Sequence, residues 1–418
     1  MSEIIINGGK RLSGRVSVQG AKNSVLPVLA GTVLCGGESV VHNCPMLSDV
    51  ETSLKILEHL GCKCRREGGA VIVDSSGVSE YDIPDSLMRE MRSSVVFLGA
   101  VIGRMGRAVI SSPGGCELGP RPIDLHLSAL ERMGVTITEE HGYLKCTAEN
   151  GLHGAEIHLG FPSVGATENI ILAAAAAAGV TVIHNAAKEP EISDLADFLN
   201  SAGARISGCG SDTVRIEGVK RLGGTEHTII PDRIVAATYM ACAAVTGGEI
   251  ELENVMPPHM VSLLWSFREC GCDISVSGKG LRLSAPERLH RIPTLRSLVY
   301  PGFPTDAGPV AVAMLASAEG TSVFVENIFE NRYRYIDELN RFGTKIKTEG
   351  KTAVIEGVGE LSGAHAKATD LRGGAALVVA ALKAHGASEI GNTHHIERGY
   401  EKITERLSSL GADISYKR

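Results

Sequence analysis

Six glycines recur along this 418-residue sequence about 70 residues apart, each between a short amphipathic helix pattern and an alternating strand pattern. A glycine just after a helix fits a left-handed C-cap, where a side chain would cost free energy. The repeat therefore predicts six copies of one folding unit. The glycines are Gly61, Gly134, Gly203, Gly271, Gly343 and Gly411.

Each unit also contains hairpin strands and a second, apolar helix pattern. Residues 204–210 with 213–217, and 273–276 with 281–284, predict two of the hairpins. The apolar helices carry Ala, Val and Leu on every face, so we expect them to be buried. They begin near Lys22, Arg92, Gly165, Arg233, Asp306 and Arg372. Four units contain Leu-x-Gly before a further strand, at residues 12–14, 152–154, 222–224 and 361–363.

The last unit stops after one strand, at residues 413–416, whereas the other units continue with a second. The segment Glu3–Asn7, followed by Leu12-Ser13-Gly14, fits the missing piece. We therefore expect an α/β (α+β) fold of six βαβαββ-like units, three per domain. Residues 22–229 would form one domain and residues 1–21 plus 230–418 the other. The cleft between them is the expected active site.

Composition argues against several classes of function. The net charge is −7, which disfavours nucleic acid as the main partner. The N-terminus lacks the basic region of a signal peptide, and the apolar residues 170–183 are too few to span a membrane. We expect a cytoplasmic protein whose ten cysteines are free thiols. Cys62/Cys64 and Cys270/Cys272 are better explained as strand residues than as zinc ligands.

Polar and basic residues gather where the helices begin. Helix N-termini carry unpaired N–H groups and partial positive charge, so they attract anions. Taken singly, Ser163, Thr305 and Asp370 could be plain N-caps. Six cations at equivalent junctions instead suggest one cleft for a ligand with several negative charges. These cations are Lys22, Arg92, Arg121, Arg332, Arg372 and Arg398.

A glycine-rich loop from residue 111 to residue 119 carries Cys116 near its tip. A cysteine in a mobile loop beside Arg121 should be accessible and partly thiolate. That suits a nucleophile or an acid in a lid that closes over substrate. A surface thiol without function fits the loop equally well.

The sequence resembles the UDP-N-acetylglucosamine 1-carboxyvinyltransferases, a family of enolpyruvyl transferases, from end to end. The matching motifs include Gly-Ala-Lys-Asn at residues 20–23, Pro-Gly-Gly-Cys at 113–116, Arg-Pro-Ile-Asp-Leu-His at 121–126 and Ser-Val-Gly-Ala-Thr at 163–167. Others are Phe-Pro-Thr-Asp at 303–306, Phe-Glu-Asn-Arg at 329–332, Asp-Leu-Arg at 370–372 and His-Ile-Glu-Arg-Gly-Tyr at 395–400. The resemblance implies a two-domain inverse α/β barrel with threefold pseudo-symmetry in each domain.

The resemblance also implies roles for individual residues. Phosphoenolpyruvate would be bound by Lys22, Asn23, Arg121, Arg332, Arg372 and Arg398. The sugar nucleotide would contact Arg92, Arg121, Pro122, Ile123, Asp124, Leu125, Ser163, Val164, Gly165, Asp306 and Ile328. Some relatives have a lysine two positions before the serine that corresponds to Ser163. Here that position is Phe161, which removes one expected contact with the diphosphate.

The reaction implied is enolpyruvyl transfer from phosphoenolpyruvate to the 3-hydroxyl of UDP-N-acetylglucosamine, the first committed step of peptidoglycan precursor synthesis. Cys116 would be the general acid and could form a covalent phospholactoyl thioether, while Asp306 would be the base. Lys22 and Arg398 would also take part in catalysis. No metal or cofactor is expected, because arginine and lysine neutralise the anions. The sequence identifies no protein partner.

Two other functions remain open. The related 5-enolpyruvylshikimate-3-phosphate synthase shares the implied fold, but the Cys116 loop and residues 121–126 argue against it. A catalytically weak regulatory paralogue should have lost Lys22, Cys116, Asp306 or Arg398, and all four are present.

Overall fold

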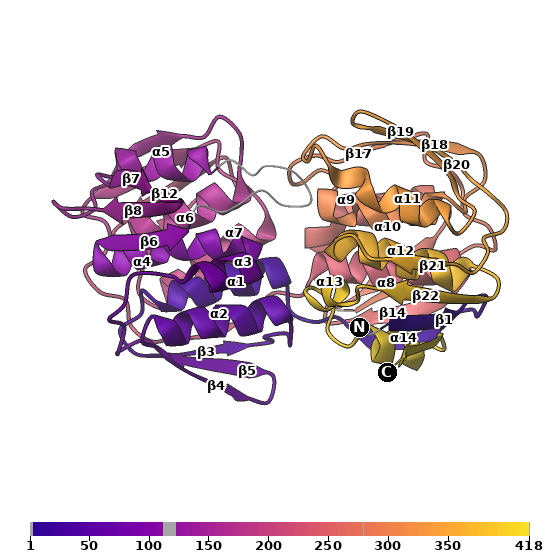
Figure 1. Cartoon of the computed structure of the whole chain (residues 1–418), viewed down its shortest axis with the longest axis horizontal. Helices are drawn as coiled ribbons and strands as arrows, with labels where there is room; N and C mark the ends of the chain where they lie inside the picture. The colour runs from indigo at the N-terminus through magenta and orange to yellow at the C-terminus, as the bar shows by residue number, and fades with distance from the viewer. Residues whose placement is uncertain (1–2, 112–122, 279, 418) are drawn as a thin grey trace. The chain divides into compact units, whose positions relative to one another are not determined.

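The computed structural model describes residues 3–111, 123–278 and 280–417, apart from the side chain of Arg92. Contacts divide the described chain into two compact units (Figure 1). The N-terminal unit contains residues 20–111 and 123–230, and the C-terminal unit contains residues 3–19 and 231–417. Each unit has its own hydrophobic core, so each is stabilised by its own buried apolar side chains.

In the N-terminal unit, three sheets surround apolar helices. One sheet has the order β13 (Glu226–Thr228), β3 (Glu38–His42), β5 (Ala70–Asp74) and β4 (Lys63–Glu67). The second has the order β9 (Glu156–His158), β10 (Val180–His184), β12 (Thr213–Glu217) and β11 (Arg205–Ser207). The third has the order β6 (Arg107–Ser111), β8 (Tyr143–Thr147) and β7 (Thr136–Glu140).

The helices of this unit fall into a buried set and an amphipathic set. The buried helices are α1 (Lys22–Thr32), α4 (Phe97–Met105, preceded by the 3₁₀ turn η1, Arg92–Val96) and α6 (Val164–Ala175). The amphipathic helices are α2 (Ser48–His59), α5 (Asp124–Arg132) and α7 (Pro190–Ser201), with the short α3 (Asp85–Glu90) beside α2.

The C-terminal unit repeats this plan with three four-stranded sheets. The first has the order β2 (Ser13–Ser17), β14 (Glu249–Glu253), β16 (Gly280–Ser284) and β15 (Asp273–Ser277). The second has the order β17 (Thr294–Arg296), β18 (Thr321–Val325), β20 (Thr352–Glu356) and β19 (Lys345–Glu349). The third has the order β21 (His365–Lys367), β22 (Ala387–Gly391), β1 (Glu3–Asn7) and β23 (Asp413–Lys417).

Three apolar helices of the C-terminal unit pack against one another: α8 (Arg233–Val245), α10 (Gly308–Leu315) and α12 (Leu371–Lys383). Every residue of α8 is buried, as expected for a helix that is apolar on all faces. The outer helices are α9 (Val261–Glu269), α11 (Ile336–Asn340) and α14 (Ile403–Ser409). Short elements complete the unit: η2 (Pro257–Met260), η3 (Thr305–Ala307), η4 (Arg332–Tyr335) and α13 (His394–Glu397).

All six sheets follow one pairing pattern, which confirms the sixfold repeat. A short strand lies parallel to the next strand, and that strand is antiparallel to one member of a hairpin. In the sheet of β6, the parallel partner is reduced to a single bridge between Asp82 and Val109. The six buried helices begin within a few residues of the predicted positions. The chain therefore has the two-domain inverse α/β barrel architecture, with helices inside and sheets outside.

Strand β1 occupies the place of the second hairpin strand in the last repeat. It pairs antiparallel with β23, Ile5 opposite Ser415, and with β22, Ile5 opposite Glu389. In Figure 1 the indigo β1 accordingly lies beside the yellow β22. The expected pairing of the first strand with the last repeat is confirmed.

Two sets of glycines recur in the repeats, and each set meets a different requirement of the backbone. All six repeat glycines have positive φ angles, from 86° to 107°, as a left-handed helix C-cap requires. Three of the four Leu-x-Gly glycines instead permit close approach between strands, whereas Gly14 has a φ of 120° and no atom closer than 3.7 Å to its Cβ position. A Cβ atom on Gly154, Gly224 or Gly363 would lie only 2.0–2.2 Å from a carbonyl oxygen of the neighbouring strand. At these three positions the glycine is therefore required by the close packing of neighbouring strands.

In five of the repeats, an asparagine just after one of the two parallel strands hydrogen-bonds to the end of the other. Its side-chain amide donates to the carbonyl oxygen just after the short parallel strand, at 2.7–3.4 Å. Four of the five have φ angles of 53–59°, a conformation that asparagine tolerates better than most residues. The residues are Asn43, Asn185, Asn254, Asn327 and Asn392, and Asn327 is the one without a positive φ.

In the N-terminal unit, Asn169 joins three helices at their starts. Its Oδ1 accepts the N–H of Gly99 at 2.6 Å, and its Nδ2 lies 3.1 Å from the carbonyl of Val95 and 2.9 Å from Nδ1 of His126. Because Nδ1 accepts this bond, the ring hydrogen lies on Nε2. Burial lowers the pKa of His126 to about 4, although Asp124 opposes the shift. The buried ring is therefore neutral at pH 7.

We predict that Gly363→Ala lowers the free energy of unfolding by about 3 kcal/mol, because its Cβ atom would meet the carbonyl oxygen of Ala387 at 2.2 Å. Gly359→Ala is the matched control in the same repeat, since a Cβ atom there meets nothing within 4 Å. Urea denaturation followed by circular dichroism measures both. Equal effects of the two substitutions would contradict the close-approach argument.

His126 should make stability depend on acid pH. Its folded-state pKa of about 4 lies below its ordinary value of 6.5, so the unfolded chain takes up the proton first as the pH falls. This contribution is complete above pH 6.5 and is lost between pH 6.5 and 4, by about 3 kcal/mol. In denaturation curves across that window, His126→Gln should show a shallower loss of stability with falling pH. The exposed His158→Gln control should keep the wild-type slope, and identical slopes for both variants would rule out the buried neutral ring.

Candidate active-site residues

Asp370 caps the N-terminus of the buried helix α12. Its Oδ1 accepts the N–H groups of Arg372 and Gly373, each at 3.0 Å, so the expected N-cap is confirmed. The same turn places Arg372 in the interior, with 3% of its side chain exposed. The helix dipole disfavours a cation at this end, and burial removes it from water. Arg372 therefore needs an anionic partner.

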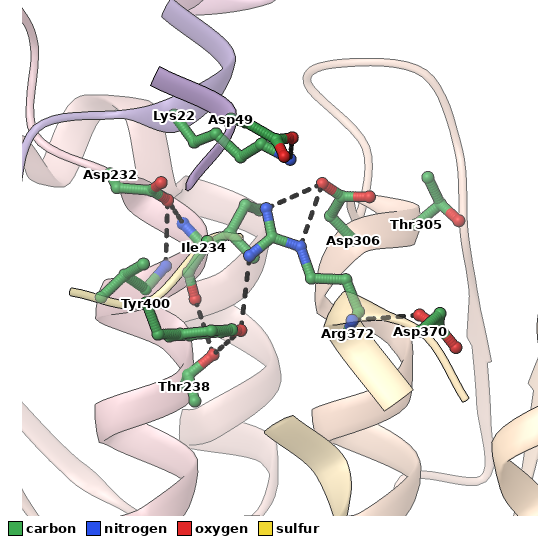
Figure 2. Close-up of polar contacts among 12 residues, drawn as sticks. Lys22, Asp49, Asp232, Ile234, Thr238, Thr305, Asp306, Asp370, Arg372 and Tyr400 are labelled. Carbon is green, nitrogen blue, oxygen red and sulfur yellow. Dashed lines mark hydrogen bonds and ion pairs between the residues drawn. The ribbon is translucent and has the colours of Figure 1, made fainter. Parts of the chain in front are cut away.

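That partner is Asp306, at the start of the fifth buried helix (Figure 2). Nη2 and Nε of Arg372 lie 3.0 and 3.3 Å from Oδ2 of Asp306, and Nη2 of Arg332 lies 3.3 Å from Oδ1. The side chain of Asp306 is 25% exposed, against 3% for each arginine. A carboxylate oxygen can accept more than one hydrogen bond, so this pairing is compatible with proton transfer by Asp306.

The surroundings of Arg372 keep it cationic. Burial by itself would lower its pKa, but the negative charges of Asp306 and Asp232 and the hydrogen bond to Tyr400 more than offset this, so the pKa lies above its ordinary value. Burial raises the pKa of Tyr400, although Arg372 opposes that shift, so the phenol stays protonated. The site thus combines a fixed positive charge with a neutral hydroxyl.

A hydrogen-bond chain connects the starts of α12 and α8. Nη1 of Arg372 donates to the Tyr400 hydroxyl at 3.4 Å, which lies 3.0 Å from Oγ1 of Thr238. Thr238 in turn donates to the carbonyl of Ile234 at 2.9 Å. Asp232 caps the same turn, because its Oδ1 accepts the N–H of Ile234 at 2.9 Å. Figure 2 shows this series of hydrogen bonds, which fixes the N-terminus of α12 relative to that of α8.

Two predicted arginines lie in surroundings that differ from the expected ones. Arg332 begins η4 as predicted, but it is buried, and its Nε is an interior donor without a hydrogen-bond acceptor among the described residues. Arg398 follows the short helix α13 as its C-cap rather than opening the amphipathic helix α14. The sequence pattern missed α13 because four residues are too few to show a helical period.

Gln19 fixes the segment that follows Arg398. Its Nε2 donates to the carbonyl of Gly399 at 3.1 Å, and its Oε1 accepts the N–H of Glu401 at 2.7 Å. The backbone carbonyl of Gln19 also accepts the N–H of Asp232. One buried amide therefore connects the residues after β2 with the loop that carries Arg398.

In the N-terminal unit, Lys22 is the first residue of α1 and is buried. Its Nζ lies 2.7 Å from Oδ2 of Asp49, which is in the first turn of α2. Asp49 offsets both the burial of the ammonium group and its unfavourable position at a helix N-terminus. Two residues further along α1, Ser24 donates to the buried carboxylate of Asp194. The start of α1 is thus held by two carboxylates from neighbouring helices.

The start of α6 has the form of an anion site. Ser163 is its N-cap, as one reading of the sequence expected, and its hydroxyl accepts the N–H of Ala166 at 3.3 Å. Gly165 packs against the ring of His126, and a Cβ atom there would be 3.1 Å from Cε1. Phe161 is 45% exposed beside this turn. The start of α6 therefore presents backbone N–H groups and an aromatic ring.

The remaining candidates are placed as follows. Ile123, Asp124 and Leu125 lie at or beside the start of α5, where Asp124 and Leu125 form its first turn. Val164 begins α6, Asn23 is exposed on α1, and Ile328 is half-buried after β18. Thr305 is not an N-cap, because its hydroxyl donates to Glu326 instead. Cys116, Arg121, Pro122 and the side chain of Arg92 lie outside the described residues. The expected convergence of all these groups on one cleft stays a prediction.

Sequence reasoning missed the buried polar residues that hold the candidates in place. Their signal was a polar residue within an apolar segment, as with Asn169 in ENIILAAAA or Glu326 after SVFV. That signal shows that a polar group is buried but does not name its partner. The missed residues are Gln19, Asp49, Asn169, Asp194 and Glu326.

Among the residues that the structure describes, no three His, Cys, Asp or Glu side chains are grouped so that they could hold a metal ion. In the same part of the chain, no helix has the length and hydrophobicity needed to cross a membrane.

Curated relatives resemble the chain over nearly its whole length. It is 52% identical over 414 residues to UDP-N-acetylglucosamine 1-carboxyvinyltransferase 2 of Caldanaerobacter subterraneus, covering 99% of both chains. It is 47% identical to UDP-N-acetylglucosamine 1-carboxyvinyltransferase 1 of Symbiobacterium thermophilum, covering 98% of this chain and 94% of that one. The Geotalea uraniireducens protein of the same name is 44% identical over 99% of both.

Solved structures support the fold. The enolpyruvyl transferase NikO from Streptomyces tendae superposes with a TM-score of 0.89 at 24% identity, covering 100% of this chain and 99% of that one. EPSP synthase from Acinetobacter baumannii gives 0.76 at 20% identity, with both chains fully covered. The family model of EPSP synthase (3-phosphoshikimate 1-carboxyvinyltransferase) matches residues 6–407. This chain belongs to the enolpyruvyl transferase family that this model describes.

Proposed function

We propose that the chain transfers the enolpyruvyl group of phosphoenolpyruvate to the 3-hydroxyl of UDP-N-acetylglucosamine and releases phosphate. The observation that carries this proposal is the 52% identity, over 99% of both chains, to a relative named for that reaction. The product would enter peptidoglycan precursor synthesis. A cytoplasmic location remains a prediction.

The chemistry is an addition followed by an elimination. The oxygen of the sugar hydroxyl bonds to C2 of phosphoenolpyruvate while C3 takes up a proton. C3 then loses a proton, the double bond re-forms, and the bond between C2 and the phosphate oxygen breaks. One group must supply a proton to C3 and another must remove the hydroxyl proton. We assign these roles to Cys116 and Asp306, and Cys116 is also the candidate for a phospholactoyl thioether.

The cations of the family motifs would bind the anionic parts of phosphoenolpyruvate. In the C-terminal unit, Arg332 and Arg372 are rigidly held beside Asp306, which supports their assignment to the phosphate or the carboxylate. In the N-terminal unit, Lys22 is fixed by Asp49. We assign Asn23, Arg121 and Arg398 to the same substrate.

The sugar nucleotide would use the starts of α5 and α6. The N–H groups of Val164 and Gly165 suit a diphosphate, and Ser163 completes that turn. Arg121 and Pro122, with the start of α5 (Ile123, Asp124, Leu125), would bracket the uracil. Arg92, Asp306 and Ile328 would contact the remainder. Because Phe161 cannot replace a lysine charge, binding of the diphosphate would depend on backbone donors.

The second candidate function is that of 5-enolpyruvylshikimate-3-phosphate synthase, whose name the family model carries. The solved synthase at 20% identity supports a shared fold and nothing finer. The acceptor that supports phosphate release distinguishes the two reactions.

Phosphate release should require both phosphoenolpyruvate and UDP-N-acetylglucosamine, and Cys116→Ser should lower kcat at least about 100-fold by removing the proton donor. Cys209→Ser is the matched control, because burial raises the pKa of that thiol to about 11. It should keep wild-type rates. A malachite-green phosphate assay measures all three proteins. Full activity of Cys116→Ser would refute the acid assignment. Phosphate release from phosphoenolpyruvate with shikimate 3-phosphate as the acceptor, and none with UDP-N-acetylglucosamine, would select the other reaction.

Asp306→Ala should lose at least about 100-fold in kcat while it still binds UDP-N-acetylglucosamine, because the base is removed but most sugar-nucleotide contacts remain. Asp306→Asn tests the charge with the shape preserved. The exposed Asp337→Ala on α11 controls for loss of a carboxylate in the same unit. Stopped assays give kcat, and calorimetry gives the affinity. Wild-type turnover in either Asp306 variant would remove it as the base.

A further inference from the structure

Glu326 follows β18 and is almost completely buried, with 1% of its surface exposed. Four groups donate hydrogen bonds to its carboxylate. Oε1 accepts the Ser297 hydroxyl at 2.8 Å and the N–H groups of Ile328 and Phe329 at 2.8 and 3.2 Å. Oε2 accepts the Thr305 hydroxyl at 2.8 Å. All four partners donate to the two carboxylate oxygens, so both oxygens serve here as acceptors.

The hydroxyl of Ser297 donates its single hydrogen to Glu326, and its oxygen also accepts the N–H of Asn327 at 2.9 Å. Thr305 is held from two directions, since its carbonyl oxygen accepts Nη2 of Arg332 at 3.2 Å. Asp306 is the next residue. The buried carboxylate of Glu326 therefore fixes two backbone segments. One is the turn that contains Thr305 and Asp306, and the other is the turn that contains Ile328.

The repeat shows that the fold does not need a carboxylate here. In four other repeats the fastening asparagine follows its long parallel strand directly, at residues 43, 185, 254 and 392. In this repeat β18 ends at Val325 and the asparagine is residue 327, so Glu326 is inserted between them. Asn327 still makes the same bond, to the carbonyl of Ser297 at 3.0 Å. The inserted residue therefore serves something particular to this repeat.

We propose that Glu326 is the positioning residue of the transfer reaction. It holds Asp306 in place through the hydroxyl of Thr305, and it holds Ile328 through that residue's backbone N–H. This inference rests on the proposed function, because it needs Asp306 to be the base. Glu326 is 1% exposed, so in this proposal it acts through these residues and not by contact with substrate.

Three variants test the path from Glu326 to Asp306. Glu326→Gln keeps the shape but replaces one acceptor oxygen with a donor. Thr305→Val replaces the donating hydroxyl with a methyl group, whereas Thr305→Ser keeps the hydroxyl. Glu356→Gln on β20 is the matched control, an exposed carboxylate in the same sheet. Steady-state kinetics with phosphoenolpyruvate and UDP-N-acetylglucosamine give kcat, both KM values and the pH dependence of kcat.

We expect Glu326→Gln and Thr305→Val each to lower kcat at least about 10-fold, because small displacements of a reacting group are costly. The KM for phosphoenolpyruvate should change less than about threefold, and the acid limb of the kcat profile should move with the displaced base. Thr305→Ser should recover most of the rate. The double variant should lose little more than the worse single one, because both interrupt the same contact.

The outcomes separate the two proposals. Wild-type protein that releases no phosphate from this substrate pair overturns the proposed function and this inference with it. Active wild-type protein with Thr305→Val at full kcat and an unmoved acid limb overturns the inference alone. Additive losses in the double variant also overturn it, since they would mean that Glu326 does not act through Thr305. If Glu326→Gln does not fold, Thr305→Val and Thr305→Ser decide the question.

Discussion

The polar residues at the buried helix starts of the C-terminal unit depend on one ionic interaction, that of the Asp306 carboxylate with two guanidinium groups. Asp306 allows Arg332 and Arg372 to be buried at helix starts, where the helix dipole and the loss of water both disfavour a cation. Tyr400 and Thr238 extend this arrangement to α8. The positive charge is therefore fixed before any ligand arrives, which is the condition under which electrostatic stabilisation of a reacting anion is most effective.

The inverted architecture explains why polar groups are found at those helix starts. When apolar helices lie inside and sheets lie outside, a helix N-terminus is a natural place for partly buried polar groups. The described residues meet this demand with N-caps such as Asp232, Ser163 and Asp370. The asparagines that fasten the sheets, and the glycines that allow strands to approach, hold the same frame in repeated copies. Variation among the copies, such as the inserted Glu326, is then where specific chemistry is introduced.

Much of the fold could be predicted from the sequence, because glycines at helix ends and apolarity on all faces are local signals. The pairing of β1 with β23 was predictable only because the last repeat lacks a strand. The N-cap roles of Ser163 and Asp370 followed from residue type, whereas Thr305 was misjudged because its hydroxyl has a stronger acceptor in Glu326. Partner choice of this kind depends on the tertiary fold. Arg332 and Arg398 were placed near helix starts correctly or nearly so, but their burial and the turn of α13 have no short-range signature.

The position of β1 has a consequence for the order of folding. This strand is synthesised about 380 residues before its two neighbours in the sheet, β22 (Ala387–Gly391) and β23 (Asp413–Lys417). The N-terminal unit is complete once residue 230 has emerged, whereas the C-terminal unit must wait for almost the whole chain. Such long-range contacts raise the contact order and slow closure of that sheet. Until then, β1 has no neighbouring strands, and its alternating apolar side chains stay exposed. Chaperones recognise exposed apolar segments of this kind.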